Sequence, residues 1–176
     1  MSWVWYFAYG SNMQAATFRG RRGIMPRAAV AAKAVGWRLV LDKPPLLSVG
    51  HSFANVVPDP GATVYGVAYE ISAEDYAHVE FSEGVQIGNY LPVDLDLETL
   101  QGGTLRAWTL SSEKRSTGLK PSLRYMALLI EGAVEHGLPD DWIAMLREIP
   151  AEEESEAAKA ARALLDRVIR KKPVAE

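Results

Sequence analysis

The chain has 176 residues, of which 48% are hydrophobic and 23% are charged, the profile of a globular protein rather than a disordered or membrane-spanning one. Its formal net charge of -3 provides no basic surface for nucleic acid or anionic lipid. The absence of cysteine excludes disulfides, a thiolate nucleophile and cysteine-ligated metal centres. The length favours one domain, so we expect residues 1–176 to form a single domain with residues 151–176 as a C-terminal helical tail.

Neither a metal site nor a membrane span is indicated. The three histidines, His51, His78 and His136, do not have the spacing of a metal-binding motif. No apolar stretch approaches the ~20 residues that a membrane span needs, and the first residues do not resemble a signal peptide. We therefore expect a cytoplasmic enzyme or binding module that uses no metal or other cofactor and has no nucleic-acid or membrane partner.

The first apolar run predicts a strand that enters a tight turn. Residues 3–9 are rich in aromatic and β-branched side chains and stop at Gly10-Ser11-Asn12. Ser11 and Asn12 are favoured cap residues, so a helix is expected to follow over residues 13–18. Such a turn leaves backbone N–H groups free to bind an anion such as carboxylate. The alternative is that these three residues only end the strand.

A loop and a strand are predicted next. The segment Phe18-Arg19-Gly20-Arg21-Arg22-Gly23 is short, basic and punctuated by glycine, so we expect a solvated loop. Residues 28–41 alternate loosely between apolar and small or basic side chains, which indicates a strand or a bent pair of strands. Pro44 and Pro45 are expected to end it.

Two hairpins are predicted further along the chain. Residues 53–57 and 64–69 have the pattern of strands, and Asp59-Pro60-Gly61 between them has the residues that a tight turn requires. Residues 90–97 and 104–110 form the second pair, joined by a turn with two glycines.

A helix with two acids on one face is predicted between the hairpins. Ser72 is a hydroxyl cap followed by acids, and the helix should run to about Ser82, with Gly84 at its end. Spacings of three and four residues place four side chains on one face: Tyr76, Val79, Glu80 and Glu83. If that face packs inward, burial and a neighbouring like charge would both raise the pKa of one acid and make it a useful base. The alternative is that both acids are solvated.

The last third of the chain is predicted to be helical. Leu123 begins a strongly amphipathic segment that stops at Gly137, and Asp140 is expected to cap a short helix after it. From Glu152 the composition is helical, acidic first and basic last, as the helix dipole favours. We expect this tail to be a surface helix or a partly docked one, without a chemical role.

Four segments, taken together and in order, resemble the γ-glutamylcyclotransferase family. They are Tyr9-Gly10-Ser11-Asn12; Phe53 to Pro58 with Val64-Tyr65-Gly66-Val67; Glu83-Gly84-Val85 followed by Gly88-Asn89-Tyr90; and Tyr125, which opens the helix that ends at Gly137-Leu138-Pro139. The resemblance covers about residues 6–149. It implies an α+β fold, a mixed and largely antiparallel β-barrel with flanking α-helices, whose cavity binds a γ-glutamyl group.

The resemblance also implies the site residues. Glu83 matches the catalytic glutamate of the family. The implied substrate-binding residues are Tyr9, Gly10, Ser11 and Asn12 in the loop, and Tyr90 and Tyr125 in the pocket. For the two pocket tyrosines the alternative is a structural role at the barrel mouth. For Ser11 we favour a structural cap over a nucleophile, because no histidine or aspartate has the spacing to activate it.

The implied reaction is an intramolecular cyclisation of lyase or transferase type. The α-amine of the substrate attacks its own γ-carbonyl, which releases 5-oxoproline and an amine or amino acid. The nucleophile comes with the substrate, so neither a serine or cysteine nucleophile nor a metal is required. The alternatives are a non-catalytic γ-glutamyl-binding or carboxylate-binding module of the same fold, and an amidohydrolase that uses water.

The leaving group is open at this point. Related branches of the family act on γ-glutamyl amino acids, on γ-glutamylamines and on glutathione, and the sequence does not choose among these small-molecule substrates. Preference is expected to depend on the irregular loops at residues 43–51 and 111–120. The oligomeric state, including a homodimer, is likewise open.

Overall fold

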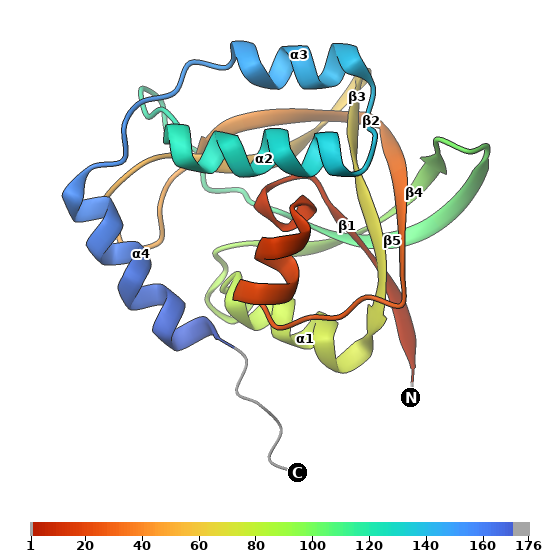
Figure 1. Ribbon diagram of the computed structural model, residues 1–176, viewed down its shortest axis with the longest axis horizontal. Coiled ribbons are helices and arrows are strands. Elements are labelled where there is room, and N and C mark those ends of the chain that lie inside the picture. The colour runs from red at the N-terminus through yellow and green to blue at the C-terminus, as the bar shows by residue number, and fades with distance from the viewer. Residues whose placement is uncertain (1, 171–176) are drawn as a thin grey trace.

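Five strands close on themselves in the order β1-β3-β2-β4-β5 in the computed structural model, which describes residues 2–170 (Figure 1). The strands are β1 (Trp3–Ala8), β2 (Ala28–Lys43), β3 (Phe53–Ser72), β4 (Leu91–Thr99) and β5 (Gly103–Ser111). Neighbours are antiparallel, except that β1 meets β5 in parallel where Tyr6 pairs with Trp108. The predicted α+β fold, a mixed and largely antiparallel barrel with flanking helices, is confirmed.

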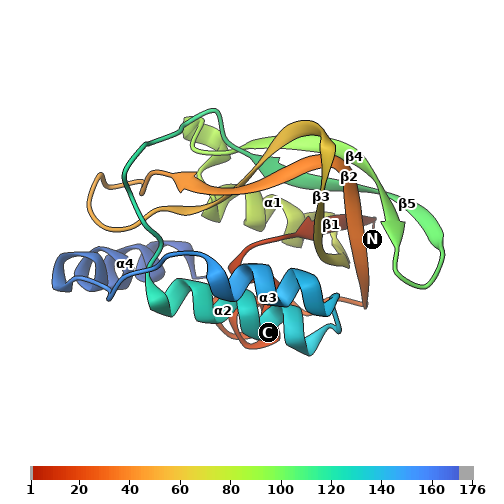
Figure 2. The same ribbon diagram turned by 90° about the horizontal axis from the view of Figure 1, so that it is seen from above.

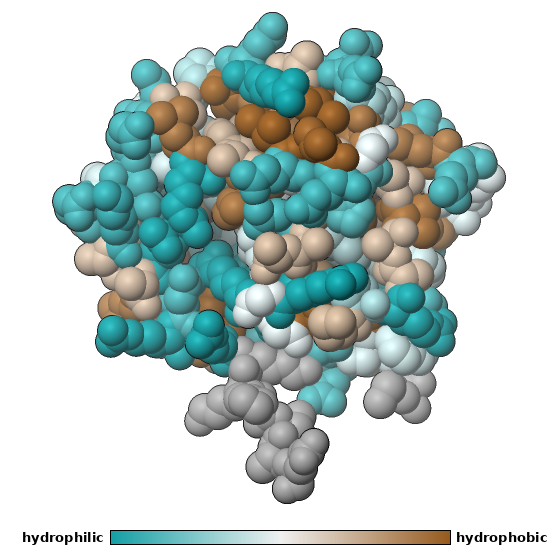
Figure 3. All heavy atoms as spheres, in the orientation of Figure 1, coloured by the Kyte–Doolittle hydropathy of each residue, from teal (hydrophilic) through white to brown (hydrophobic). Residues whose placement is uncertain are grey.

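Four α-helices surround the strands. They are α1 (Ala73–Ser82), α2 (Leu123–Glu135), α3 (Asp140–Glu148) and α4 (Glu156–Ile169). Figures 1 and 2 show α2 and α3 side by side on one side of the strands, with α1 at the opposite end of the molecule and α4 along another edge. Figure 3 shows an apolar patch between polar side chains over α2 and α3. None of these helices, within residues 2–170, is both long and apolar enough to cross a bilayer.

Local sequence signals place most helix ends correctly. Ser72 caps α1 by accepting a hydrogen bond from the backbone of Asp75, and Gly84 ends the helix with a left-handed φ of 72°. The second hairpin is confirmed, because β4 and β5 pair along their whole length. The amphipathic helix α2 is also confirmed, although Pro139 rather than Asp140 occupies the cap position of α3.

The hairpin predicted around Asp59-Pro60-Gly61 is wrong. β3 continues through these residues as a single strand and pairs with β2 from Ala28 to Lys43. The register shifts between Val35 and Trp37, and this irregularity accommodates the extra residues of β3. Proline lacks the N–H donor of a regular ladder but is tolerated at such a bulge, so the turn residues mark a distortion here rather than a reversal.

The helix predicted over residues 13–18 has the wrong bounds. A single 3-10 turn, η1 (Ser11–Met13), follows β1, and a π-helical turn, η2 (Thr17–Arg21), comes after it. Neither turn has a side-chain cap, because the cap positions are occupied by Gly10 and Ala16, whose side chains offer no acceptor. Ser11 therefore does not act as the predicted cap.

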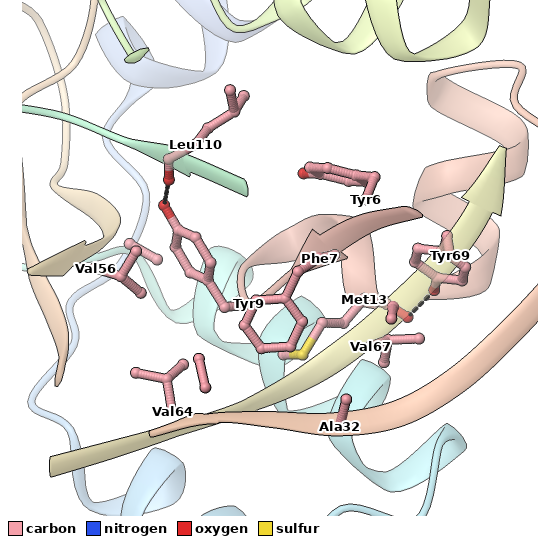
Figure 4. Close-up of a cluster of buried hydrophobic side chains, with 14 of the residues drawn as sticks. Tyr6, Phe7, Tyr9, Met13, Ala32, Val56, Val64, Val67, Tyr69 and Leu110 are labelled. Carbon is pink, nitrogen blue, oxygen red and sulfur yellow. Dashed lines mark hydrogen bonds between the residues drawn. The ribbon is translucent and has the colours of Figure 1, made fainter. Parts of the chain in front are cut away.

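The turn after β1 is held from two sides. Tyr69 on β3 donates its hydroxyl hydrogen to the Met13 carbonyl at 2.8 Å, within the apolar cluster of Figure 4. On the other side, a Cβ added to Gly132 of α2 would lie 2.7 Å from the Gln14 nitrogen and the Met13 carbonyl carbon. The backbone of α2 therefore packs directly against this turn, and only glycine allows so close an approach.

Candidate active site

One cavity of about 390 Å³ contains every residue that the sequence analysis assigned to the site. Its lining includes Tyr9, Gly10, Ser11, Asn12, Glu83, Tyr90 and Tyr125. These residues come from the end of β1 and its turn, the end of α1, the start of β4 and the start of α2. The barrel therefore joins four segments that are distant in the sequence around one space.

Glu83 stands at the end of α1 with its backbone fixed. Its N–H donates to the Val79 carbonyl at 3.0 Å, and its own carbonyl accepts a hydrogen bond from the Asn89 side chain at 2.9 Å. Gly84 then turns the chain sharply away. The Glu83 side chain is 22% exposed, so the carboxylate faces the cavity without being open to bulk solvent.

The predicted solvated loop at residues 18–23 is wrong for Arg22, whose side chain is only 4% exposed. Its guanidinium donates hydrogen bonds to the Glu83 carboxylate and to the Ser82 hydroxyl. It also donates to the Asn12 side-chain oxygen at 3.2 Å. The buried Arg22 thus links the candidate catalytic acid to the turn after β1. Arg19 and Arg21 are close to it in the sequence, and nothing in that basic segment indicated that Arg22 would be the buried one.

The face of α1 that carries Tyr76 and Val79 packs inward, the first of the two alternatives left open by the sequence, but the group beside Glu83 is a cation. Tyr76 and Val79 are 9% and 0% exposed. Burial and the charge of Glu80 raise the pKa of the Tyr76 phenol well above its usual range. The two acids on this face therefore have different surroundings, Glu80 beside a tyrosine and Glu83 against Arg22.

Two of the tyrosines at the cavity use their hydroxyl hydrogens on the protein backbone. Tyr9 donates to the Leu110 carbonyl, as Figure 4 shows. Tyr90 donates to the Ala54 carbonyl at 2.9 Å. These hydrogen bonds link the end of β1 and the start of β4 to neighbouring segments. Each ring therefore forms part of the cavity wall, and its hydroxyl hydrogen is not available to a ligand.

Two other tyrosines keep their hydroxyl hydrogens. Tyr125 accepts a hydrogen bond from the Ala54 N–H at 3.2 Å, and Tyr6 accepts one from the Asn12 side-chain amide at 3.0 Å. Burial raises the pKa of Tyr6 to about 12 and that of Tyr125 above its usual range, so both phenols stay protonated near neutral pH. Each can therefore donate a hydrogen bond to a ligand in the cavity.

The turn after β1 supplies further donors. Its hydrogen bonds run from the N–H groups of Met13 and Gln14 to the carbonyls of Gly10 and Ser11, at 3.1 and 3.2 Å. In such a turn the N–H groups at the start have no partner within the turn. The backbone N–H groups around Ser11 are therefore placed to bind an anionic oxygen in the cavity.

Lys43 is a second buried cation that sequence reasoning missed. Its side chain is 2% exposed and donates to the Asn89 side-chain oxygen at 2.6 Å and to the Pro44 carbonyl at 2.7 Å. The ammonium lies 5.0 Å from the centre of the Tyr90 ring. Burial lowers the pKa of Lys43 to about 8, although Glu83 partly opposes the change. Its position at the start of an irregular loop gave no sign of burial.

The C-terminal tail was expected to have no chemical role, yet α4 forms one wall of the cavity. Arg21 pairs with Asp166 of α4 at 2.5 Å. His51, in the loop after β2, contacts two residues that come just before α4. It lies 3.1 Å from the Glu152 carboxylate and accepts a hydrogen bond from the Ser155 N–H at 3.1 Å. These contacts hold the tail against the loop after β2; residues 171–176 lie outside the part that the structure describes.

No metal centre is formed by the described residues. Within residues 2–170, no group of three or more histidine, aspartate or glutamate side chains is arranged to hold a metal ion.

Comparisons with known proteins point to one family. The model of the AIG2-like family matches residues 63–146. The γ-glutamyl cyclotransferase aclK of Aspergillus oryzae is 34% identical over 164 residues, which cover 82% of this chain but only 60% of that protein. The γ-glutamylcyclotransferase of Bos taurus is 27% identical over 151 residues, covering 82% of this chain and 77% of its own length.

A solved structure of a γ-glutamyl cyclotransferase has the same fold. It superposes with a TM-score of 0.77 at 20% sequence identity and covers 94% of this chain and 99% of its own. The agreement extends over nearly the full length of both chains, so the barrel and its flanking helices are common to the two proteins.

Proposed function

This chain belongs to the γ-glutamylcyclotransferase family, and we propose that it is a cofactor-free enzyme that cleaves a γ-glutamyl amide to 5-oxoproline and an amine or amino acid. The observation that supports this proposal best is the cavity in which the Glu83 carboxylate and the Gly10-Ser11-Asn12 turn face a common space. We further propose that α4 belongs to the same single domain, because it forms a wall of that cavity.

The reaction makes and breaks one bond at the γ-carbonyl carbon. The α-amine of the substrate attacks that carbon and closes a five-membered lactam, and the bond to the amide nitrogen breaks. The proton lost by the α-amine goes to the leaving nitrogen. Holding the two reacting atoms together can lower the barrier by ~7–11 kcal/mol, so the main task of the protein is to fold the glutamyl arm.

In this mechanism Glu83 moves the proton. Arg22 binds its Oε1 atom, and within residues 2–170 no hydrogen bond is found at Oε2. Oε2 is therefore available to take the proton from the α-amine and to deliver it to the leaving nitrogen. Arg22 and Ser82 would act as positioning residues, since they hold the acid and its neighbouring turn in place.

The oxygens of the substrate would be bound by donors of the turn after β1 and by Tyr125, which line the same cavity. The N–H groups around Ser11 suit the α-carboxylate or the oxyanion that develops on the γ-carbonyl. The Tyr125 hydroxyl lies close to this turn, since a Cβ added to Gly10 would be 3.1 Å from it. Each donor to the oxyanion is typically worth about 3 kcal/mol in the transition state.

The test is a panel of γ-glutamyl compounds assayed for 5-oxoproline, with Glu83→Gln as the diagnostic variant. We expect this variant to lose about 10²–10⁴-fold in kcat, because it lacks the proton-transferring group. Glu80→Gln, on the same face of α1, is the matched control and should keep its activity. A Glu83→Gln variant that is folded and as fast as the parent would show that the assigned role is wrong.

The same panel separates the two alternative functions. Release of free glutamate instead of 5-oxoproline would identify an amidohydrolase. Calorimetric binding of a γ-glutamyl compound with neither product formed would identify a binding module.

A further inference from the structure

The cavity around Glu83 has a polar floor and an apolar mouth. The floor holds the Glu83 carboxylate, the Arg22 guanidinium and the Asn12 amide, which are joined by hydrogen bonds. The mouth is formed by the loop after β2, the segments on either side of Glu83, and α4. The two parts therefore suit different halves of a ligand.

Exposed apolar side chains gather at this mouth. Within residues 2–170, seventeen large hydrophobic side chains are exposed, and seven of them line this cavity. They include Leu47 in the loop after β2, Phe81 and Ile87 on either side of Glu83, and Val168 on α4, with exposed fractions of 42%, 52%, 65% and 62%. A cluster of exposed apolar side chains at one opening is typical of a binding surface rather than of ordinary surface variation.

The reaction decides which half of a substrate meets this surface. The γ-glutamyl arm carries an α-ammonium and an α-carboxylate, which need the polar partners of the floor. The substituent on the amide nitrogen points away from that arm and leaves through the opening. It is therefore the leaving half that contacts the apolar side chains.

Most charges at the mouth are already neutralised by protein partners. Arg162 is held by both oxygens of Glu154 at 2.9 and 3.0 Å, and Arg21 is paired with Asp166. Of the arginines that line the cavity, Arg124 is the one without an ion pair among residues 2–170. Apolar contact is thus the larger source of affinity at the mouth, and an acidic leaving half drawn to Arg124 is the competing occupant.

We infer that the preferred substrate is a γ-glutamyl amide whose leaving amine or amino acid carries a large apolar group, a conclusion that rests on the proposed function. The apolar group would lie between α4 and the loop after β2 while the glutamyl arm lies on the floor. The preference should appear mainly in KM, because the contact exists in both the ground state and the transition state.

The first test compares γ-glutamyl-alanine, γ-glutamyl-leucine and γ-glutamyl-phenylalanine with γ-glutamyl-glutamate and glutathione. We expect kcat/KM to rise about tenfold from alanine to leucine or phenylalanine, less than full burial of the added carbons would give, because the mouth is partly open. Equal values along the apolar series, or higher values for γ-glutamyl-glutamate or glutathione, would overturn the inference.

The second test uses two substitutions on α4. Val168 and Leu164 are exposed to similar extents, 62% and 56%, but only Val168 is among the residues that line the cavity. Val168→Asp should lower kcat/KM for γ-glutamyl-leucine about fivefold more than for γ-glutamyl-alanine, whereas Leu164→Asp should leave both unchanged. If the two variants behave alike, the mouth does not contact the leaving half.

A binding measurement separates this inference from the proposed function. If no compound yields 5-oxoproline, the proposed reaction is wrong. Calorimetry on the parent chain then still measures whether the mouth of the cavity binds apolar leaving groups more tightly. Tighter binding of γ-glutamyl-phenylalanine than of γ-glutamyl-alanine would support the apolar preference. Equal binding of the two would overturn it.

Discussion

The two sides of the cavity are built in opposite ways. On the inner side, Glu83, Arg22, Asn12 and Tyr6 form a continuous chain of hydrogen bonds among largely buried groups. The outer side, made of α4 and the loop after β2, presents exposed apolar side chains. A change on the inner side should therefore affect folding and chemistry together, and a change on the outer side should affect mainly which amide is bound.

Two consecutive arginines show the contrast most directly. Arg21 is 27% exposed and pairs with Asp166 on the outer side, whereas Arg22 is 4% exposed and pairs with Glu83 on the inner side. A surface ion pair contributes little to stability, but removing one partner of a buried pair leaves the other charge uncompensated. Neighbouring residues of one type should therefore give very different results when replaced.

The largest effect is expected for Arg22→Met. It leaves the Glu83 carboxylate partly buried without its cation, so the free energy of unfolding should fall by about 3 kcal/mol and kcat by about 10²-fold. Urea denaturation and the 5-oxoproline assay measure the two losses. Arg21→Met is the matched control and should lose under ~1 kcal/mol. Similar losses in both variants would mean that the two sides do not differ as described.

Next in size is Gly132→Ala, which tests the support of the inner turn. The added methyl would meet the backbone of Met13 and Gln14 at 2.7 Å, so α2 or the turn must shift. We expect a loss of about 2 kcal/mol and a Tm lower by roughly 4–8 °C in thermal unfolding. Gly20→Ala has no atom within 4 Å of the added Cβ and serves as the control, with little change expected.

Lys43→Met tests the buried cation through pH. Lys43 loses its proton near pH 8 in the native state but near pH 10.5 when unfolded, so between these values the unfolded state binds more protons. The parent should therefore gain about 1–2 kcal/mol of stability relative to Lys43→Met between pH 7 and 9.5. Denaturation curves across this range measure the gain, and a constant difference between the two proteins would contradict a lowered pKa.

The Lys43 comparison is best kept below pH 10. The buried Tyr6, with its pKa raised to about 12, keeps its proton in the native state while unfolded tyrosines ionise near pH 10. The unfolded state then binds fewer protons, and the stability of both proteins falls as the pH rises further.

The smallest effect is expected for Asp166→Asn, which removes the ion pair between α4 and Arg21. Both side chains are partly exposed, so the loss of stability should be about 0.5 kcal/mol. Turnover of γ-glutamyl-alanine should change less than that of γ-glutamyl-leucine, because only the latter depends on the outer wall. An equal change with both substrates in the 5-oxoproline assay would contradict the division between the two sides.

Local patterns were sufficient for much of the fold. The cap at Ser72, the glycine after α1 and the amphipathic repeat of α2 act over three or four residues, so a short window contains all the information they need. The candidate site was found by a different route, because Glu83 and the Tyr9 to Asn12 loop were located through their resemblance to family motifs. Their place in one cavity agrees with that resemblance.

The failures involve contacts between distant residues. Asp59-Pro60-Gly61 has the composition of a turn, but β3 pairs with β2 on both sides of this segment, so the chain passes through it as a bulge. Arg22 meets Glu83 across 61 positions of the sequence, and Arg21 meets Asp166 across 145. No local pattern distinguishes an arginine that will be desolvated from one that will be solvated.

The sequence by itself determined the hairpin of β4 and β5, the Ser72 cap of α1, the acid at position 83 and the small-residue turn, because each depends on near neighbours or on a short motif. Only the tertiary structure decided that Arg22 and Lys43 are buried, which tyrosines retain a free hydrogen, and that α4 closes the cavity. Those features depend on which surfaces meet when the barrel closes, and burial of a charge is set by groups brought together from the whole chain.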